Sequence, residues 1–130
     1  QTTPLACVAL ILVLDQFPRN MFRDQPKSFA SDPQARKVTR FALKMGYHQI
    51  LPLPLQVFLY IPLMHSENIE DQQASLKLFE ALGNEQYANS AFRHHMIIEK
   101  FGRFPHRNKI LRRESTEEEL AFLKTPNSRF

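Results

Sequence analysis

Hydrophobic residues recur every three or four positions through most of the chain, which is the spacing of one helix face. The clearest stretch follows the helix start Ser31-Asp32-Pro33 and ends at the helix stop Gly46. Similar patterns predict helices over residues 4–16, 20–23, 33–45, 54–63, 68–82, 85–101, 109–113 and 120–123. No stretch alternates with a period of two, so the sequence predicts an all-α fold.

Prolines and capping residues set the expected helix ends. Thr3-Pro4 starts the first helix, and Phe17-Pro18 is expected to end it, because a residue before proline is biased away from helical geometry. Pro62 is expected to kink or shorten the helix that contains it. The last helix has a capping box, formed by Ser115 with Glu118 or by Thr116 with Glu119.

Composition narrows the class of protein. At 130 residues and 43% hydrophobic, residues 1–130 are expected to form a single helical domain. With three glycines there is little from which to build a Gly-rich phosphate loop, and we expect no cofactor. The longest apolar run, residues 4–14, is too short to span a bilayer, so we expect no membrane partner. The single cysteine, Cys7, cannot form an internal disulfide, which favours a reducing, cytoplasmic location.

Charge is unevenly distributed along the chain. Residues 100–113 carry six basic side chains and no acidic one, whereas residues 66–86 carry five acidic side chains against Lys77. Such a separation of charge is typical of two surfaces that face water and attract each other. The basic segment also suits an anionic partner. We expect no nucleic-acid partner, because the basic segment lacks a motif that reads RNA or DNA.

A short motif occurs twice. Phe17-Pro18-Arg19-Asn20 follows the first predicted helix, and Phe104-Pro105-His106-Arg107-Asn108 follows the fifth with one residue inserted. We call these two segments the Phe-Pro elbows. Either each arginine binds the carbonyls at a helix end, or both arginines face one cleft.

The histidines are candidates for proton transfer rather than for metal binding. His65 and Glu67 can act as an acid/base pair only if the helix before them ends near Ser66, because two residues apart on a helix they would point about 200° apart. His94 and His95 are adjacent, hence about 100° apart on a helix, and no metal-ligand spacing is present. We therefore expect no metal site.

Three blocks of sequence carry a family resemblance: residues 14–23, residues 60–67 with Asp71-Gln72, and residues 101–108. They resemble the signature blocks of the bacterial family called domain of unknown function 924, in the family's order. The likeness extends from the first helix to residues 119–123. The resemblance implies an all-α, tetratricopeptide-like array of antiparallel helices, and it implies no assigned activity.

The start of the chain also differs from that family. Members usually carry further helical sequence, rich in Trp and Phe, ahead of the first block, whereas this sequence opens with Gln1-Thr2-Thr3 and contains no Trp. We therefore expect N-terminal helices to be missing. Their absence would leave part of the helix over residues 4–14 exposed, which predicts self-association of this chain.

Residues from three distant helix ends are expected to meet in a polar, cation-rich cleft that binds a small anionic molecule or peptide. The expected ligand-binding residues are Asp15, Arg19, Asn20, Arg103, Arg107 and Asn108. The expected catalytic residues, for a hydrolase-type reaction, are His65, Glu67 and His106. The alternative is a tetratricopeptide-like interaction scaffold without catalysis. A third interpretation is that the same residues form buried ion pairs that hold the helix ends in place.

Overall fold

The computed structural model describes residues 3–129 and contains no strand within that range, which confirms the all-α prediction. The elements, in chain order, are α1 (Pro4–Ile11), the π-helix η1 (Leu12–Gln16), α2 (Phe17–Met21), η2 (Pro26–Phe29), α3 (Asp32–Lys44), η3 (Tyr47–Gln49), α4 (Leu53–Met64), α5 (Ile69–Ala81), α6 (Glu85–Phe101), η4 (Pro105–Arg107) and α7 (Glu117–Leu123).

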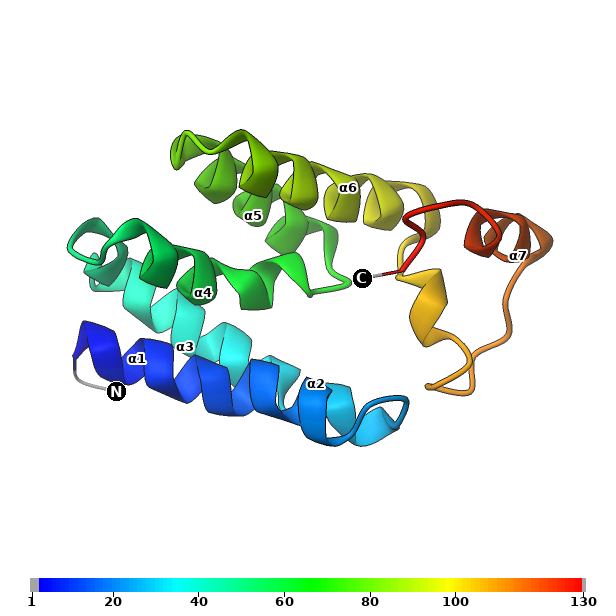
Figure 1. Ribbon diagram of the computed structural model, residues 1–130, viewed down its shortest axis with the longest axis horizontal. Coiled ribbons are helices and arrows are strands. Elements are labelled where there is room, and N and C mark those ends of the chain that lie inside the picture. Colours follow the sequence, from blue (N-terminus) through cyan, green and yellow to red (C-terminus); the bar gives the residue numbers. More distant parts are fainter. Residues whose placement is uncertain (1–2, 130) are drawn as a thin grey trace.

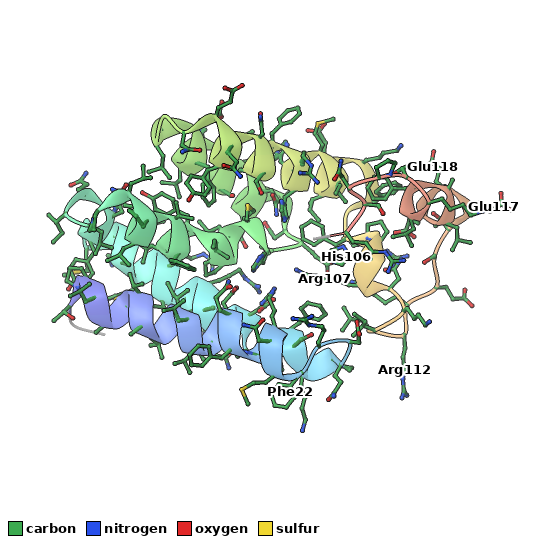
Figure 2. The ribbon with its side chains drawn as sticks, viewed as in Figure 1. Phe22, His106, Arg107, Arg112, Glu117 and Glu118 are labelled. Atoms are coloured by element: carbon green, nitrogen blue, oxygen red, sulfur yellow. The ribbon has the colours of Figure 1, made fainter. Side chains whose placement is uncertain are left out.

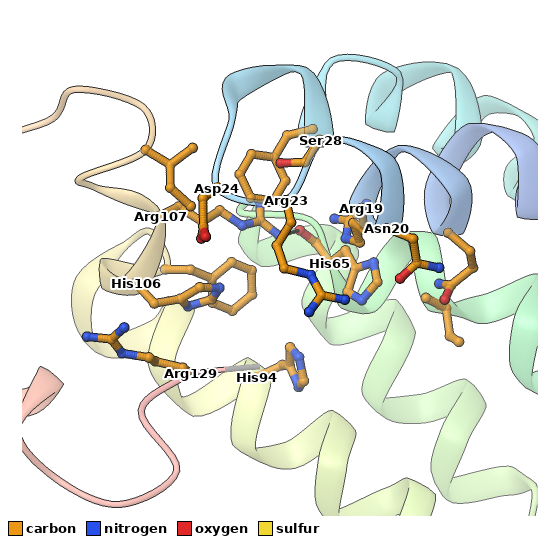
Figure 3. A pocket seen from close by; sticks show the side chains of 15 residues that line it. Arg19, Asn20, Arg23, Asp24, Ser28, His65, His94, His106, Arg107 and Arg129 are labelled. Atoms are coloured by element: carbon orange, nitrogen blue, oxygen red, sulfur yellow. Dashed lines mark hydrogen bonds between the residues drawn. The ribbon is translucent and has the colours of Figure 1, made fainter.

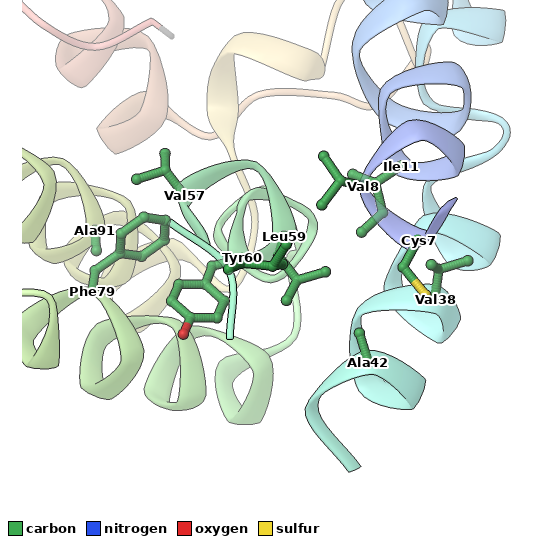
Figure 4. Packing of buried hydrophobic residues seen from close by; sticks show 11 residues of the cluster. Cys7, Val8, Ile11, Val38, Ala42, Val57, Leu59, Tyr60, Phe79 and Ala91 are labelled. Atoms are coloured by element: carbon green, nitrogen blue, oxygen red, sulfur yellow. The ribbon is translucent and has the colours of Figure 1, made fainter. Parts of the chain in front are cut away.

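The long helices stack in one direction, each beside the next (Figure 1). The order across the stack is α1, α3, α4, α5 and α6, and the segment with η4 and α7 lies beyond the C-terminal end of α6. The main core runs through this stack and includes Ile11 of α1, Leu59 of α4 and Phe79 of α5 (Figure 4). A smaller cluster around Phe104 receives Phe122 of α7. The tetratricopeptide-like character of the array stays a prediction.

The predicted caps are present at the helix starts except at α3, where the Ser31 side chain makes no cap hydrogen bond. The Thr3 hydroxyl accepts a hydrogen bond from the backbone N–H of Ala6, and Asn68 and Asn84 cap α5 and α6 in the same way. The capping box of the last helix uses Thr116 with Glu119. Gly102 has a φ of 73° directly after α6, a geometry that other residues rarely adopt.

The prediction that Phe17-Pro18 ends the first helix is wrong. Residues 4–21 are helical throughout, and the π-helix η1 lies immediately before the proline. Pro18 has no N–H with which to bond the carbonyl of Leu14, four residues earlier. The Ser31 hydroxyl donates to that carbonyl instead, at 2.6 Å. The Ser31 side chain therefore supplies the hydrogen bond that the Leu14 carbonyl cannot receive from Pro18.

Three smaller expectations also change. The short helix predicted over residues 109–113 is absent, because residues 109–112 form turns, with Arg112 in the left-handed region at a φ of 57°. Figure 2 shows its side chain pointing away from the helices. Pro62 was expected to kink or shorten its helix, and it does not shorten it, because α4 continues to Met64. The last helix begins three residues earlier than predicted, at Glu117.

Large apolar side chains are exposed along the first helical segment. Leu5 is 64% exposed and Met21 68% exposed, and Val13 and Phe17 between them are more than half exposed. No residue from Pro4 to Leu14 is charged. Within residues 3–129, no helix is long and apolar enough to cross a membrane.

Self-association through this apolar surface stays a prediction. Sedimentation velocity should show a concentration-dependent oligomer, which a Val13→Lys variant shifts to monomer because a charge in an apolar contact is costly. Phe92→Lys, at an exposed site on α6, is the matched control and should leave the oligomer unchanged. A wild-type chain that stays monomeric at all concentrations would contradict the prediction.

Candidate functional site

The site is built around Asp15, a fully buried carboxylate in the π-helix η1. Its Oδ2 lies 3.0 Å from Nδ1 of His65 and 3.4 Å from Nη1 of Arg19, and its Oδ1 accepts from the Gln16 amide at 2.7 Å. Burial alone would raise the pKa of Asp15, but the neighbouring His65 and Arg19 lower it below its usual value. Asp15 is therefore ionised and can only accept hydrogen bonds.

His65 lies directly after α4 and is held by that carboxylate. Burial lowers the pKa of His65, Arg19 and Arg107 lower it further, and Asp15 offsets only part of the effect. The imidazole is thus neutral at neutral pH. Because Asp15 only accepts, Nδ1 of His65 carries the hydrogen and Nε2 carries the lone pair.

Arg19, on the first Phe-Pro elbow, is fixed by carboxylates. It donates to both oxygens of Asp32 at 2.7 and 2.9 Å, and to the backbone carbonyl of Asp15 at 3.1 Å. Asp32 is the first residue of α3. This forked pair joins the end of the first helical segment to the start of the next long helix.

Arg107, on the second elbow, is buried, and no carboxylate of the described residues forms an ion pair with it. Its side chain is only 6% exposed, and its Nη2 donates to the backbone carbonyl of His65 at 2.8 Å. Its guanidinium lies over the rings of Phe29 and Phe104, at 4.5 and 4.7 Å. Its Nε has no hydrogen-bond partner, and none of the ion pairs within residues 3–129 includes it. Burial lowers its pKa to about 10, so it remains charged at neutral pH.

Both elbows border one cavity of about 580 Å³ (Figure 3). Arg19 and Arg107 approach the same ring, that of Phe29, at 5.3 and 4.5 Å from its centroid. The cavity is also lined by the arginines Arg23 and Arg129 and by the histidines His65, His94 and His106. Asp24 is the one acidic residue among those that line it.

The other two histidines of the cavity are neutral at neutral pH. Burial lowers the pKa of His94 to about 3, although a 2.7 Å hydrogen bond between its Nδ1 and the Ser90 carbonyl opposes the shift. Burial and then Arg107 lower the pKa of His106 to about 4. The positive charge of the cavity therefore comes from its arginines.

The structure brings part of the predicted set together. Arg19, Asn20, His65, His106 and Arg107 line the cavity, and Asp15 lies behind His65. The carboxylate of Asp15, rather than that of Glu67, is the partner of His65. The first predicted condition for a His65 and Glu67 pair, a helix end near Ser66, is met because α4 ends at Met64.

Glu67, Arg103 and Asn108 do not line the cavity. Glu67 accepts a forked pair from Arg113, at 2.9 and 3.0 Å, and the backbone N–H of Phe104 at 2.7 Å. The same network includes the contacts of Arg103 with Glu119 and of Asn108 with Arg113 and Ser115. These ion pairs and hydrogen bonds hold the segment after α6 in place, which is the role that the third interpretation of the sequence gave to these residues.

Several lining residues were not among the sequence candidates. Arg23 ends the first signature block and could have been chosen from it. The adjacency of His94 and His95 speaks against a metal site and gives no sign that His94 lines a cavity. Phe29 and Arg129 carry no sequence signal that links them to the elbows. In the part of the chain that the structure describes, no group of three His, Cys, Asp or Glu residues is placed to hold a metal ion.

Fold and site together define an all-helical protein with an arginine-rich cavity between two Phe-Pro elbows. The chain belongs to a bacterial family of unknown function, domain of unknown function 924, whose family model matches residues 1–127. This confirms the resemblance carried by the three sequence blocks.

A solved structure is similar to this chain. It is the structure of protein of unknown function ATU0120 from Agrobacterium tumefaciens, with 43% sequence identity and a TM-score of 0.90. The match covers 94% of this chain and 69% of that chain. No curated protein matches the chain.

The neutral histidines predict how stability depends on pH. Below pH 6.5 a histidine in the unfolded chain binds a proton, whereas folded His94, with a pKa of about 3, does not. As the pH decreases below 6.5, His94 should therefore lower the free energy of unfolding by about 1.4 kcal/mol per pH unit. Urea unfolding curves, measured from neutral pH to about pH 5, give the slope.

A His94→Gln variant isolates this contribution. Its slope should be smaller than the wild-type slope by about 1.4 kcal/mol per pH unit. Equal slopes for the two proteins would show that His94 is not held neutral by the fold.

Proposed function

We propose that the cavity binds a small anionic molecule and that Arg107 is its anchor. The observation that carries the proposal is a buried guanidinium that lines a cavity and has no carboxylate partner in the described residues. A buried charge is costly unless it is paired. An anion in the cavity would supply the missing partner and an acceptor for the open Nε.

The surroundings of Arg107 support this role. Its two aromatic neighbours, Phe29 and Phe104, exclude water on the faces of the guanidinium and leave its edge for hydrogen bonds. Arg19, by contrast, is already neutralised by Asp32. It therefore positions the first elbow and offers additional hydrogen-bond donors to a ligand in the cavity. The Asn20 amide, which also lines the cavity, is a further donor.

The pair of Asp15 and His65 supports hydrolysis as the reaction. With Nδ1 bonded to Asp15, the Nε2 lone pair of His65 can take a proton from water. The water oxygen then bonds to the electrophilic atom of the bound ester, and the bond to the leaving oxygen breaks. The imidazolium returns its proton to that oxygen, which restores neutral His65. Asp15 stabilises the imidazolium while it exists, and the arginines stabilise the charge on the substrate.

His106 contributes differently from the sequence prediction. With a pKa of about 4, its imidazole is neutral and unsuited to act as a general acid at neutral pH. In this proposal it hydrogen-bonds the ligand. Glu67, Arg103 and Asn108 support the wall behind it through their own ion pairs and hydrogen bonds.

A protein-interaction scaffold is the second candidate function. The observation that favours it is the exposed apolar surface of the first helical segment, formed by Leu5, Val13, Phe17 and Met21. This surface is separate from the residues that line the cavity, so binding a protein and binding a small anion are compatible.

Anion binding is tested by thermal unfolding in the presence of inorganic phosphate, with sodium chloride at equal ionic strength as reference. Phosphate should raise the unfolding temperature of the wild-type chain, because a ligand that binds only the folded state stabilises it. Arg107→Gln should abolish the rise, and Arg112→Gln, at an exposed arginine outside the cavity, should retain it. Arg107→Lys should retain only part of it, since lysine lacks the forked donors.

The same proteins test the hydrolytic step with 4-nitrophenyl phosphate as substrate. Release of 4-nitrophenolate should be lost in His65→Gln and retained in His95→Gln, because His95 does not line the cavity. An equal phosphate response in wild type and Arg107→Gln would reject the anchor. Equal hydrolysis in wild type and His65→Gln would reject the base.

A further inference from the structure

We propose that the ligand of this cavity is a hydroxylated acid, that is, an anion whose body carries neutral hydroxyl groups. This inference rests on the proposed anion site and specifies the body of its ligand. The observation behind it is the hydrogen-bond polarity of the cavity wall. Ser28, His65 and His94 line the cavity, and each of them uses its one polar hydrogen within the protein. Toward a ligand, such groups accept hydrogen bonds and do not donate them.

Ser28 of η2 is the first of these acceptors. It is only 3% exposed and lines the cavity. A hydroxyl has one hydrogen, and the Ser28 hydroxyl donates it to the backbone carbonyl of Gln25 at 2.6 Å. Ser28 can therefore offer a ligand only the lone pairs of its oxygen.

Asp15 gives the neighbouring part of the wall the same polarity. Because ionised Asp15 accepts the hydrogen of His65 Nδ1, the Nε2 atom of His65 carries a lone pair. The amide nitrogen of Gln16, which also lines the cavity, donates to Asp15 at 2.7 Å, so the amide oxygen of Gln16 is a further acceptor. One buried carboxylate thus binds hydrogens from two side chains of the cavity wall.

His94 of α6 is an acceptor for the same reason. Its Nδ1 lies 2.7 Å from the backbone carbonyl of Ser90, and a carbonyl can only accept. Neutral His94 therefore carries its hydrogen on Nδ1 and its lone pair on Nε2. Its ring lies 6.4 Å from the ring of His65, measured between centroids. The acceptors come from η2, from the end of α4 and from α6, so they lie on several sides of the cavity (Figure 3).

This polarity selects a ligand that has hydrogen-bond donors besides its acid group. A ligand that displaces water from the wall loses binding energy unless it donates to these acceptors. The donor is a hydroxyl rather than an ammonium, because the guanidinium of Arg107 repels a second cation in the same cavity. The histidines respond to the same repulsion, since burial together with the charge of Arg107 lowers the pKa of His94 and of His106.

The acceptors are compatible with the proposed hydrolysis. In that reaction the Nε2 atom of His65 takes a proton from water. Ser28, Gln16 and His94 take no part in the proton transfer, so they can hold the hydroxyl groups of the substrate throughout the step. Arg107 holds the acid group.

Isothermal titration with three phosphonates that cannot be hydrolysed tests the inference. The compounds are 2,3-dihydroxypropylphosphonate, propylphosphonate and 3-aminopropylphosphonate, which share the acid group and a three-carbon chain. The dihydroxy compound should bind about tenfold more tightly than propylphosphonate, because only its hydroxyls donate to the wall. The amino compound should bind no more tightly than propylphosphonate, because Arg107 repels its ammonium.

Variants with matched controls assign the preference to the cavity wall. Ser28→Ala removes one acceptor and should reduce the preference for the dihydroxy compound over propylphosphonate by about threefold. Thr39→Val should leave it unchanged, because Thr39 is another buried hydroxyl that donates to a backbone carbonyl but lies outside the cavity lining. His94→Phe keeps a ring and removes its nitrogens, and it should also reduce the preference. His95→Phe, next to it but outside the lining, should not.

The outcomes separate the two levels of the proposal. If none of the three compounds binds, the anion site itself is wrong. If propylphosphonate binds as tightly as the dihydroxy compound, the anion site stands and the hydroxylated acid is rejected. Tightest binding of the amino compound would also reject it, in favour of an ammonium paired with Asp24, the one carboxylate among the lining residues. A preference that persists in both Ser28→Ala and His94→Phe would place the hydroxyl groups elsewhere and overturn the inference.

Discussion

The burial of the Asp15 carboxylate is the constraint on which the site depends. A carboxylate withdrawn from water is costly by several kcal/mol unless positive or hydrogen-bonding groups surround it. Asp15 meets this requirement with His65 from the end of α4 and with Arg19 from its own helical segment. Since Arg19 also pairs with Asp32 of α3, one buried charge ties together three helices. The cavity lies beside these contacts, since Arg19 and His65 both line it. The hydrogen bond with Asp15 fixes the orientation of His65.

Much of the fold follows from local sequence because the helix boundaries have local causes. Side-chain caps such as Asn68 and Thr116 satisfy the first N–H groups of a helix within three residues, so they can be recognised without knowing the fold. The end of the first helix could not be predicted in this way. The carbonyl that Pro18 leaves open is satisfied by Ser31, and that contact exists only after α3 has packed against the first helical segment.

The site was predictable where the sequence repeats and unpredictable where distant residues pair. The two Phe-Pro elbows gave one shared cleft for Arg19 and Arg107 as one of two interpretations, and both arginines border one cavity. Their environments differ because Asp32 pairs with Arg19 but not with Arg107. Phe29 contacts both arginines, and neither Asp32 nor Phe29 belongs to the repeated motif. Glu67 looked like the partner of His65 by proximity in sequence. The fold gives it to Arg113 instead, 46 residues further along the chain.

The position of the proton on His65 tests most directly whether Asp15 organises the site. Long-range correlations between ring protons and ring nitrogens, recorded by NMR at neutral pH on uniformly ¹⁵N-labelled protein, distinguish the two neutral tautomers from the imidazolium. Assignment follows from the signals that disappear in His65→Gln. The pairing with ionised Asp15 predicts the neutral form with the hydrogen on Nδ1. A hydrogen on Nε2 alone, or a doubly protonated ring, would contradict the account.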